Sequence, residues 1–149
     1  MGSNRRENLV NEYRWPYDRS ETPSFPTIEV NIISPTLNVE LQTSRTLRLK
    51  VDTGYAGQIM LSTDLYNQGF HLAELPEEKF GMYRTAAGPV EVKRARAMVR
   101  LPSLSAIVEG IVETPRRIHF DRNLAGRGLL QQFQLLLDGP KAESCLTLG

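Results

Sequence analysis

The chain has 149 residues, a length that allows one domain with a buried core but is short for an enzyme of two lobes. Hydrophobic residues make up 40% of it, charged residues 23%, and the formal net charge is +1, which excludes a general attraction to nucleic acid or to an acidic membrane surface. Cys145 is the only cysteine, which excludes an internal disulfide and a thiolate cluster for zinc and leaves open a bridge between two chains.

The N-terminal segment 1–26 is dense in Arg, Asn, Glu, Ser and Pro and follows neither the helical nor the strand period. We therefore expect a flexible arm over 1–26 and one folded domain over 27–149. Trp15-Pro16-Tyr17 is the only apolar cluster of the arm, and it either docks on a surface or is loosely held. No apolar run is long enough to cross a bilayer, and the charged N-terminus lacks the pattern of a secretory signal. We expect a cytoplasmic protein with no membrane partner.

From Thr27 the pattern changes to that of β-strands. Apolar and polar residues alternate over 28–32, over 37–41 and over 47–51, with turn residues between these segments. Three short strands in succession are typical of an antiparallel sheet or barrel. Ile59-Met60-Leu61 predicts one further buried strand.

A short helix is expected next. Ser62 or Thr63 can cap its start, the helix runs through Gln68, and Gly69 stands at the usual C-terminal position.

The longest predicted hairpin covers 80–101, with the small residues 85–89 at its tip. The alternation slips between Lys93 and Arg94, which predicts a bulge or a bend. Tyr83 lies close to the tip, where it either forms a hydrogen bond near a site or only packs.

A basic run follows the tip of this hairpin. It has no interleaved aromatic residues, so a solvated strand edge that discourages aggregation is favoured over a nucleic-acid surface. The run consists of Lys93, Arg94, Arg96 and Arg100.

The last third predicts a strand over 106–112, a charged connection over 114–123, a short helix, and two final strands over 134–138 and 142–148 joined by a Gly-Pro turn. The expected core residues of this part are Leu129, Leu130, Phe133, Leu135 and Leu137.

Asp52 follows the strand 47–51 directly, and Thr53, Gly54 and Gly57 come after it. The glycines permit a tight turn and the close approach of another backbone. A carboxylate that a rigid strand carries to the edge of a core is a candidate for acid–base chemistry. By itself the tripeptide Asp-Thr-Gly is also common in ordinary polar turns.

Three segments, taken together, favour a catalytic role for that tripeptide over an ordinary turn. They are Val51-Asp52-Thr53-Gly54, the turn 85–89, and Leu124-Ala125-Gly126-Arg127-Gly128-Leu129-Leu130. In order and spacing they resemble the catalytic motif, the flap tip and the apolar-apolar-Gly-Arg helix start of the retropepsin-like aspartic proteases, the single-domain homodimeric relatives of retroviral protease. The resemblance spans about 27–148. It implies an all-β fold, a closed β-barrel of acid-protease type with one short C-terminal helix.

The resemblance implies an aspartic endopeptidase that acts on peptide or protein substrates and needs no metal or other cofactor. The family's chemistry uses two carboxylates about 3 Å apart that share one proton. This chain has one such motif, so the second carboxylate must be Asp52 of another copy, which predicts a homodimer. One Asp52 would activate a water molecule and the other would polarise the scissile carbonyl.

The other site residues also follow from the resemblance. Thr53 would tie the two catalytic loops together across the two-fold axis, and Gly54 would leave room for the substrate backbone. Gly126 and Arg127 would give structural support. The flap residues expected to close over the substrate are Thr85, Ala86, Ala87 and Gly88.

The chain departs from the retroviral pattern in one respect. Retroviral members carry an acidic residue shortly after Asp-Thr-Gly that pairs with the helix arginine, whereas Tyr55-Ala56-Gly57 offers none, so Arg127 needs another acceptor. We expect the C-terminal strand around Cys145 to take part in the dimer sheet.

Two alternatives remain open. The chain could be a catalytically silent member of the fold that binds peptides or serves as a dimerisation module, or an unrelated β-domain in which Asp52 is a turn residue. A zinc hydrolase is disfavoured because His71 and His119 have no second ligand at metal spacing, and no serine stands in a nucleophile elbow.

Overall fold

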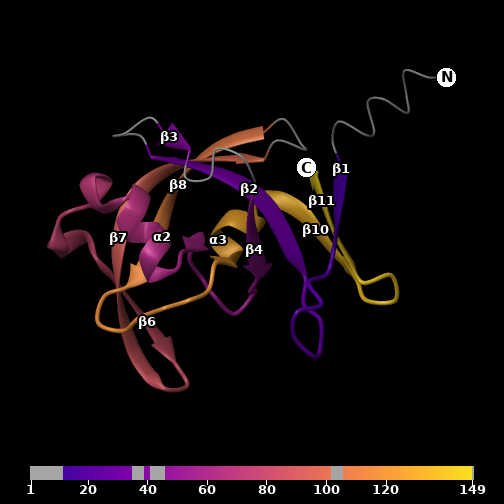
Figure 1. Cartoon of the computed structure of the whole chain (residues 1–149), viewed down its shortest axis with the longest axis horizontal. Helices are drawn as coiled ribbons and strands as arrows, with labels where there is room; N and C mark the ends of the chain where they lie inside the picture. The colour runs from indigo at the N-terminus through magenta and orange to yellow at the C-terminus, as the bar shows by residue number, and fades with distance from the viewer. Residues whose placement is uncertain (1–11, 35–38, 41–45, 102–105, 149) are drawn as a thin grey trace.

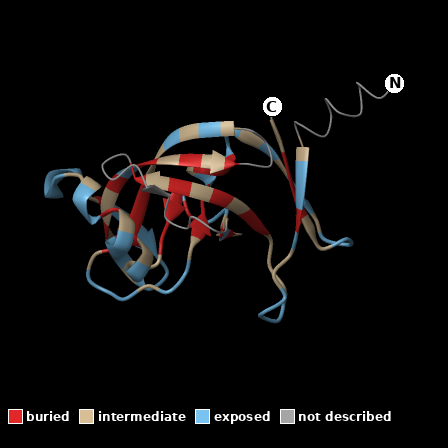
Figure 2. Cartoon of the chain, turned by 45° about the horizontal axis from the view of Figure 1, so that its top comes forward, coloured by how far each residue is buried: buried red, intermediate tan, exposed pale blue. Residues whose placement is uncertain are grey.

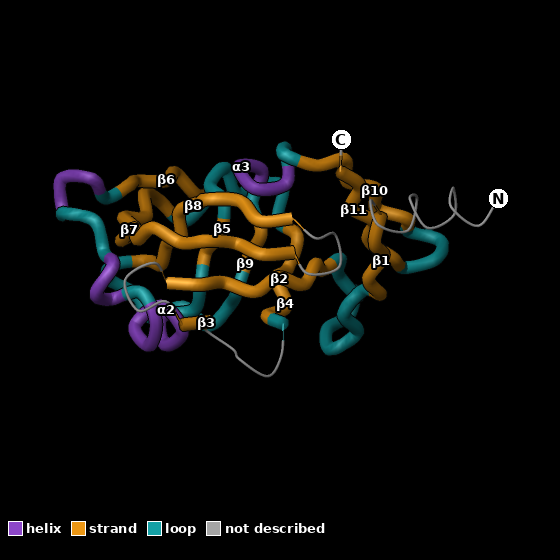
Figure 3. The backbone as a smooth tube through the Cα atoms, turned by 90° about the horizontal axis from the view of Figure 1, so that it is seen from above, coloured by secondary structure: helices purple, strands orange, loops and turns teal. Residues whose placement is uncertain are grey.

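The computed structural model describes residues 12–34, 39–40, 46–101 and 106–148, and these form a mostly β structure. Two sheets are present among them (Figure 1). The smaller has the order β1-β11-β10, and the larger has the order β3-β2-β4-β9-β5-β8-β7-β6. Figure 3 shows the smaller sheet beside the larger one, next to the C-terminus.

The strands of the smaller sheet are β1 Glu12–Pro16, β10 Phe133–Asp138 and β11 Glu143–Leu148. The strands of the larger sheet are β2 Thr27–Ser34, β3 Val39–Glu40, β4 Leu47–Val51, β5 Ile59–Met60, β6 Gly81–Thr85, β7 Gly88–Leu101, β8 Ala106–Pro115 and β9 Leu124–Ala125. The helices are α2 Thr63–Gly69, η1 His71–Ala73, η2 Glu77–Lys79 and α3 Arg127–Leu130. None of the described helices is long and apolar enough to cross a membrane.

The larger sheet closes on itself because β2 also pairs with β7, with Ile32 opposite Val99. The ring runs through β2, β4, β9, β5, β8 and β7. Most neighbours are antiparallel, but β4 pairs with β9, and β5 with β8, in parallel. Because residues far apart in sequence meet in these parallel pairs, the segment after β4 comes to lie beside the segment after β9.

The strand periods predict the buried face correctly. In β4, Leu47, Leu49 and Val51 are buried and alternate with Arg48 and Lys50, and β2 alternates in the same way. Figure 2 shows the buried residues concentrated in the strands of the larger sheet. The main core includes Ile28, Leu49, Ile59, Tyr66, Phe70, Leu101, Leu129 and Leu146.

Helix α2 also follows the sequence prediction. Ser62 is its N-cap, and its side-chain oxygen accepts a hydrogen bond of 3.3 Å from the backbone N–H of Leu65. The helix ends at Gly69.

Part of the predicted flexible arm is ordered. Residues 12–16 form β1, which pairs with β11, and Trp15 is only 3% exposed. The apolar cluster 15–17 is expected either to dock on a surface or to be loosely held, and Trp15 is docked. The backbone pairing with β11 and the burial of the Trp15 indole together hold this otherwise polar segment in place. Residues 1–11 lie outside the described part, and the assignment of a protease domain to 27–149 stays a prediction.

The sequence predicts a bulge or a bend in β7, and no bulge interrupts its ladder with β8. The register is continuous from Val92 opposite Pro115 to Leu101 opposite Ala106. The slip in the apolar pattern has another cause, because the two ends of β7 bury opposite faces. Val92 packs in a second cluster with Tyr55, Met60 and Leu124, whereas residues from Ala95 onward pack in the main core.

One further prediction needs correction. Leu129 and Leu130 are buried as expected, but Leu137 is 42% exposed, because β10 is the edge strand of the small sheet and only its first residues reach the core. Cys145 has a free and buried thiol in the middle strand of that sheet, and burial raises its pKa. A bridge between two chains would therefore require this thiol to become exposed.

Candidate functional site

Asp52 stands at the end of β4, where the parallel partner β9 holds its backbone. Its N–H donates to the carbonyl of Ala125 at 2.9 Å, and its carbonyl accepts from the N–H of Tyr55 at 3.1 Å. The side chain turns back over the loop, since the N–H of Gly54 donates to Asp52 Oδ1 at 3.0 Å. The carboxylate is partly exposed. A strand end and three backbone contacts thus fix the position of one carboxylate.

The segment that opens α3 clamps this loop, which we call the Asp52 loop (residues 52–58). The N–H of Gly126 donates to the carbonyl of Gln58 at 2.8 Å, that of Arg127 to Tyr55 at 2.9 Å, and that of Gly128 to Gly57 at 3.0 Å. A Cβ at Gly126 would lie 2.2 Å from the Gly57 carbonyl oxygen. Residue 126 must therefore be glycine for the two backbones to come this close.

A cavity of about 620 Å³ opens beside Asp52. It lies between the Asp52 loop and the β6–β7 hairpin (residues 81–92). We call this hairpin the flap after the sequence prediction, as a label for these residues alone. Its walls are mainly apolar, and Asp52 is the only acidic residue among the described residues that line it. The lining includes Asp52, Gly54, Tyr55, Ala56, Met60, Met82, Tyr83, Arg84, Thr85, Val90, Pro115, Ile118, Phe120, Leu124 and Arg127.

The tip of the flap is a tight turn organised by Thr85. Its hydroxyl donates to the carbonyl of Gly88 at 2.7 Å and accepts from the N–H of Ala87 at 3.2 Å. Gly88 has φ = 112°, a conformation that favours glycine. Thr85 lines the cavity, whereas Ala86 and Ala87 are exposed at the tip.

Thr53 follows Asp52 in the chain, and Arg127 lines the same cavity as Asp52. Both are exposed. Arg127 lines the cavity, and it forms no ion pair with any residue that the structure describes. The other acceptor that the sequence calls for is therefore not found as an ion-pair partner among the described residues.

A buried polar cluster that the sequence patterns do not reveal lies behind this cavity. Glu113, on β8, is 2% exposed and accepts hydrogen bonds from the Tyr55 hydroxyl, from the Tyr83 hydroxyl at 2.7 Å and from Arg94 Nε at 2.6 Å. Arg94 was assigned to a solvated basic edge, but β7 lies inside the ring and this side chain points to Glu113. The sequence signal does not single out Glu113, because the apolar segment 106–115 contains two glutamates and the other, Glu109, is exposed.

The cluster shifts the acidity of its members. Burial raises the pKa of Tyr55, and the adjacent Glu113 carboxylate raises it further. The same two causes raise the pKa of Tyr83. Burial alone would lower the pKa of Arg94, but its hydrogen bonds to Glu113 and Tyr83 raise it overall.

No metal centre is seen in the described part of the chain, where no group of three or more His, Cys, Asp or Glu side chains could hold an ion. His71 and His119 are both exposed.

Comparison with known proteins gives few relatives. No protein-family model matches the chain. An uncharacterised protein of Archaeoglobus fulgidus is 28% identical over 113 residues, which is 76% of this chain and 86% of that protein. Among solved structures, EIAV protease complexed with the inhibitor HBY-793 is similar with a TM-score of 0.45 and 18% identity, over 74% of this chain and 89% of that one. These similarities are too low to carry an argument about activity, so the case for a function rests on the site itself.

The contact between Gly126 and the Asp52 loop gives a first prediction. Gly126→Ala should lower the free energy of unfolding by about 1–3 kcal/mol, because its Cβ cannot fit against the Gly57 carbonyl without a backbone shift. Gly139→Ala is the matched control, since a Cβ there meets nothing within 4 Å. Urea unfolding measures both. Equal stability of the two variants would show that the clamp is not tight.

The raised pKa values give a second prediction, for alkaline pH. Tyr55, Tyr66 and Tyr83 keep their protons in the folded state at a pH where they lose them in the unfolded state. Their contribution to stability is therefore complete below about pH 10, the ordinary tyrosine pKa, and is lost as the pH rises above it.

An ultraviolet titration of tyrosinate should show these three groups ionising late, together with unfolding. Tyr55→Phe should remove one late-ionising group. An unchanged late amplitude in that variant would contradict the burial of the Tyr55 hydroxyl.

Proposed function

We propose that the chain is an aspartic endopeptidase that works as a homodimer, with Asp52 of each copy forming one site. A single observation carries the proposal: the cavity under the flap contains one carboxylate, presented at a strand end, and no second acid among its described lining residues. Hydrolysis by a carboxylate pair needs a second acid close to the first. A two-fold axis beside Asp52 would supply it, because such an axis places the same residue of both copies on either side.

In the proposed reaction the ionised Asp52 takes a proton from a water molecule held between the two carboxylates, and that water attacks the scissile carbonyl carbon. The protonated Asp52 of the other copy donates a hydrogen bond to the carbonyl oxygen and later helps to protonate the leaving amine. The hydrogen bond from the Gly54 N–H orients the carboxylate before substrate binds. No step requires a metal or an organic cofactor.

The proposed substrate is an extended peptide segment. β6 is the last strand in the order of the larger sheet, so its outer backbone groups can pair with a peptide that lies along the flap. The apolar cavity walls suit side chains on either side of the scissile bond. Closure of the flap over the peptide would exclude water.

The remaining roles belong to the same proposal. The exposed Thr53 would tie the two Asp52 loops together across the axis, and Ala86, Ala87 and Gly88 would let the flap tip move. Gly126 and Arg127 would support the loop, Gly126 through its close backbone contact. The closed barrel of acid-protease type is part of this proposal, for which the pairing of β2 with β7 is the support.

Asp52→Asn should keep the fold and the dimer but reduce cleavage of an unstructured protein to background, because neither copy then provides an ionisable carboxylate. Asp121→Asn is the matched control, since Asp121 is exposed and does not line the cavity. Activity is measured at acid to neutral pH with and without a statine-type inhibitor and a chelator, and the dimer by sedimentation.

Full activity of Asp52→Asn, or activity of a stable monomer, would refute the proposal. Loss of activity with the chelator would indicate a metal enzyme. A dimer that binds peptide without cleaving it would favour the catalytically silent alternative.

A further inference from the structure

The buried carboxylate of Glu113 joins two segments that must work together at the cavity. One oxygen, Oε1, accepts hydrogen bonds from the hydroxyls of Tyr55, on the Asp52 loop, and Tyr83, on the flap strand β6. The other oxygen, Oε2, accepts from Arg94 Nε. A carboxylate buried to this extent is stable only when its oxygens are paired. Here two of the three donors, Tyr55 and Tyr83, line the cavity, and the third, Arg94, lies on β7.

Two glycines make room for this cluster, one on each segment. A Cβ at Gly57, in the Asp52 loop, would lie 2.5 Å from Glu113 Oε1 and 2.4 Å from the Tyr55 hydroxyl oxygen. A Cβ at Gly81, the first residue of β6, would lie 2.2 Å from Arg94 Nη2. The loop and the flap strand are therefore both shaped around the same group of side chains.

The two tyrosines also form part of the cavity wall. Tyr55 and Tyr83 both line the cavity, and their rings pack edge to face with centroids 5.5 Å apart. The Glu113 oxygen that they share thus sets the distance between the loop that carries Asp52 and the strand that carries the flap.

We infer that Glu113 is a positioning residue that couples the flap to the Asp52 loop through Tyr83 and Tyr55. Its kinetic consequence rests on the proposed peptidase function, whereas the mechanical coupling does not. If Glu113 served only to neutralise Arg94 in the core, the tyrosine hydroxyls would be dispensable and their removal would not loosen the flap.

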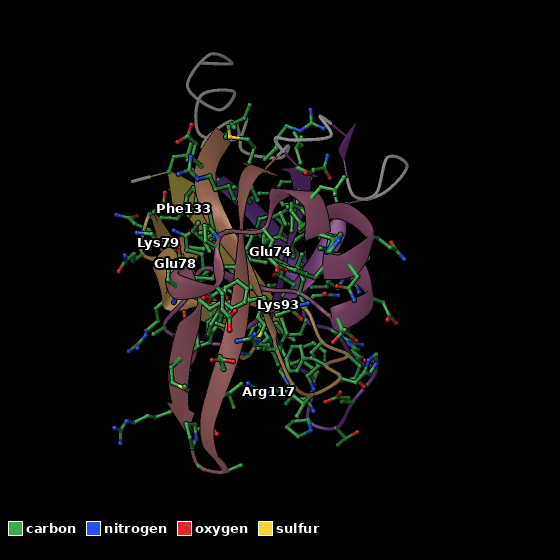
Figure 4. All side chains as sticks on the ribbon, turned by 90° about the vertical axis from the view of Figure 1, so that its left-hand side faces the viewer. Glu74, Glu78, Lys79, Lys93, Arg117 and Phe133 are labelled. Carbon is green, nitrogen blue, oxygen red and sulfur yellow. The ribbon has the colours of Figure 1, made fainter. Side chains whose placement is uncertain are left out.

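The discriminating variant is Tyr83→Phe, which removes one hydroxyl and keeps the ring. Tyr66→Phe is the matched control. Its hydroxyl is also bound to a carboxylate, that of Glu74 at 3.0 Å, and its ring lies under Lys93. Figure 4 labels Glu74 and Lys93, and neither they nor Tyr66 line the cavity.

Backbone amide exchange followed by mass spectrometry on the full chain tests the coupling without any need for activity. In Tyr83→Phe, exchange over 81–92 should be about fivefold faster than in the native protein, the change expected for one net hydrogen bond, while exchange over 59–70 stays the same. In Tyr66→Phe the flap should exchange at the native rate. Equal flap exchange in both variants, or a uniform increase over the whole chain in Tyr83→Phe, would overturn the inference.

Kinetics with an unstructured protein substrate give the second readout. Tyr83→Phe should raise KM about fivefold with a smaller effect on kcat, because a loosened flap weakens substrate capture. Tyr66→Phe should leave both unchanged. An unaltered KM in Tyr83→Phe would overturn the kinetic part, whereas an inactive native protein with the predicted exchange pattern would refute the peptidase and keep the coupling.

Discussion

The parallel pairing of β4 with β9 is the constraint on which the site depends. It places Val51 opposite Ala125, so that the chain leaving β4 at Asp52 meets the chain entering α3 at Gly126. Three backbone hydrogen bonds then hold the Asp52 loop against that helix start, and the missing side chain of Gly126 makes their lengths attainable. The positions of these donors leave the carboxylate itself free to face the cavity. Asp52 is therefore held by backbone geometry, with its side chain available for chemistry.

The two carboxylates near the cavity illustrate opposite uses of the same group. Glu113 is buried, and its oxygens accept hydrogen bonds from two hydroxyls and a guanidinium. We infer that it serves to position the segments that carry these donors. Asp52 is partly exposed and accepts from one backbone N–H, that of Gly54. A carboxylate must be reached by water or a substrate to exchange a proton with it, and Glu113 is only 2% exposed. This contrast supports the proposal that Asp52 carries the chemistry and Glu113 the support.

Local sequence patterns predict much of the fold. The period of two in 47–51, the Ser62 cap and the small tip residues 85–89 each depend on neighbours in the chain, and the structure has β4, α2 and the β6–β7 hairpin turn at those places. The exposure of Leu137 was not predictable, because it depends on which strand lies at the edge of a sheet.

The long-range features of the site could not be read from local patterns. The pairing of β1 with β11 joins residues more than a hundred positions apart, and its only signal was the single indole of Trp15. Arg94 looked like a member of a solvated run because its partner, Glu113, is brought to it by the ladder between β7 and β8. The position of Asp52 was predictable from its strand, whereas the Tyr55–Glu113–Tyr83 contact was not.

The central claim, that each chain provides half of a site, is tested most directly by mixing subunits. Native chains are unfolded and refolded together with increasing fractions of Asp52→Asn chains, and peptidase activity is measured at constant total protein. If both copies of Asp52 are needed, activity falls as the square of the native fraction, to about a quarter in an equal mixture. A linear fall, to about half in the equal mixture, would show that one chain holds a complete site and would contradict the shared carboxylate pair.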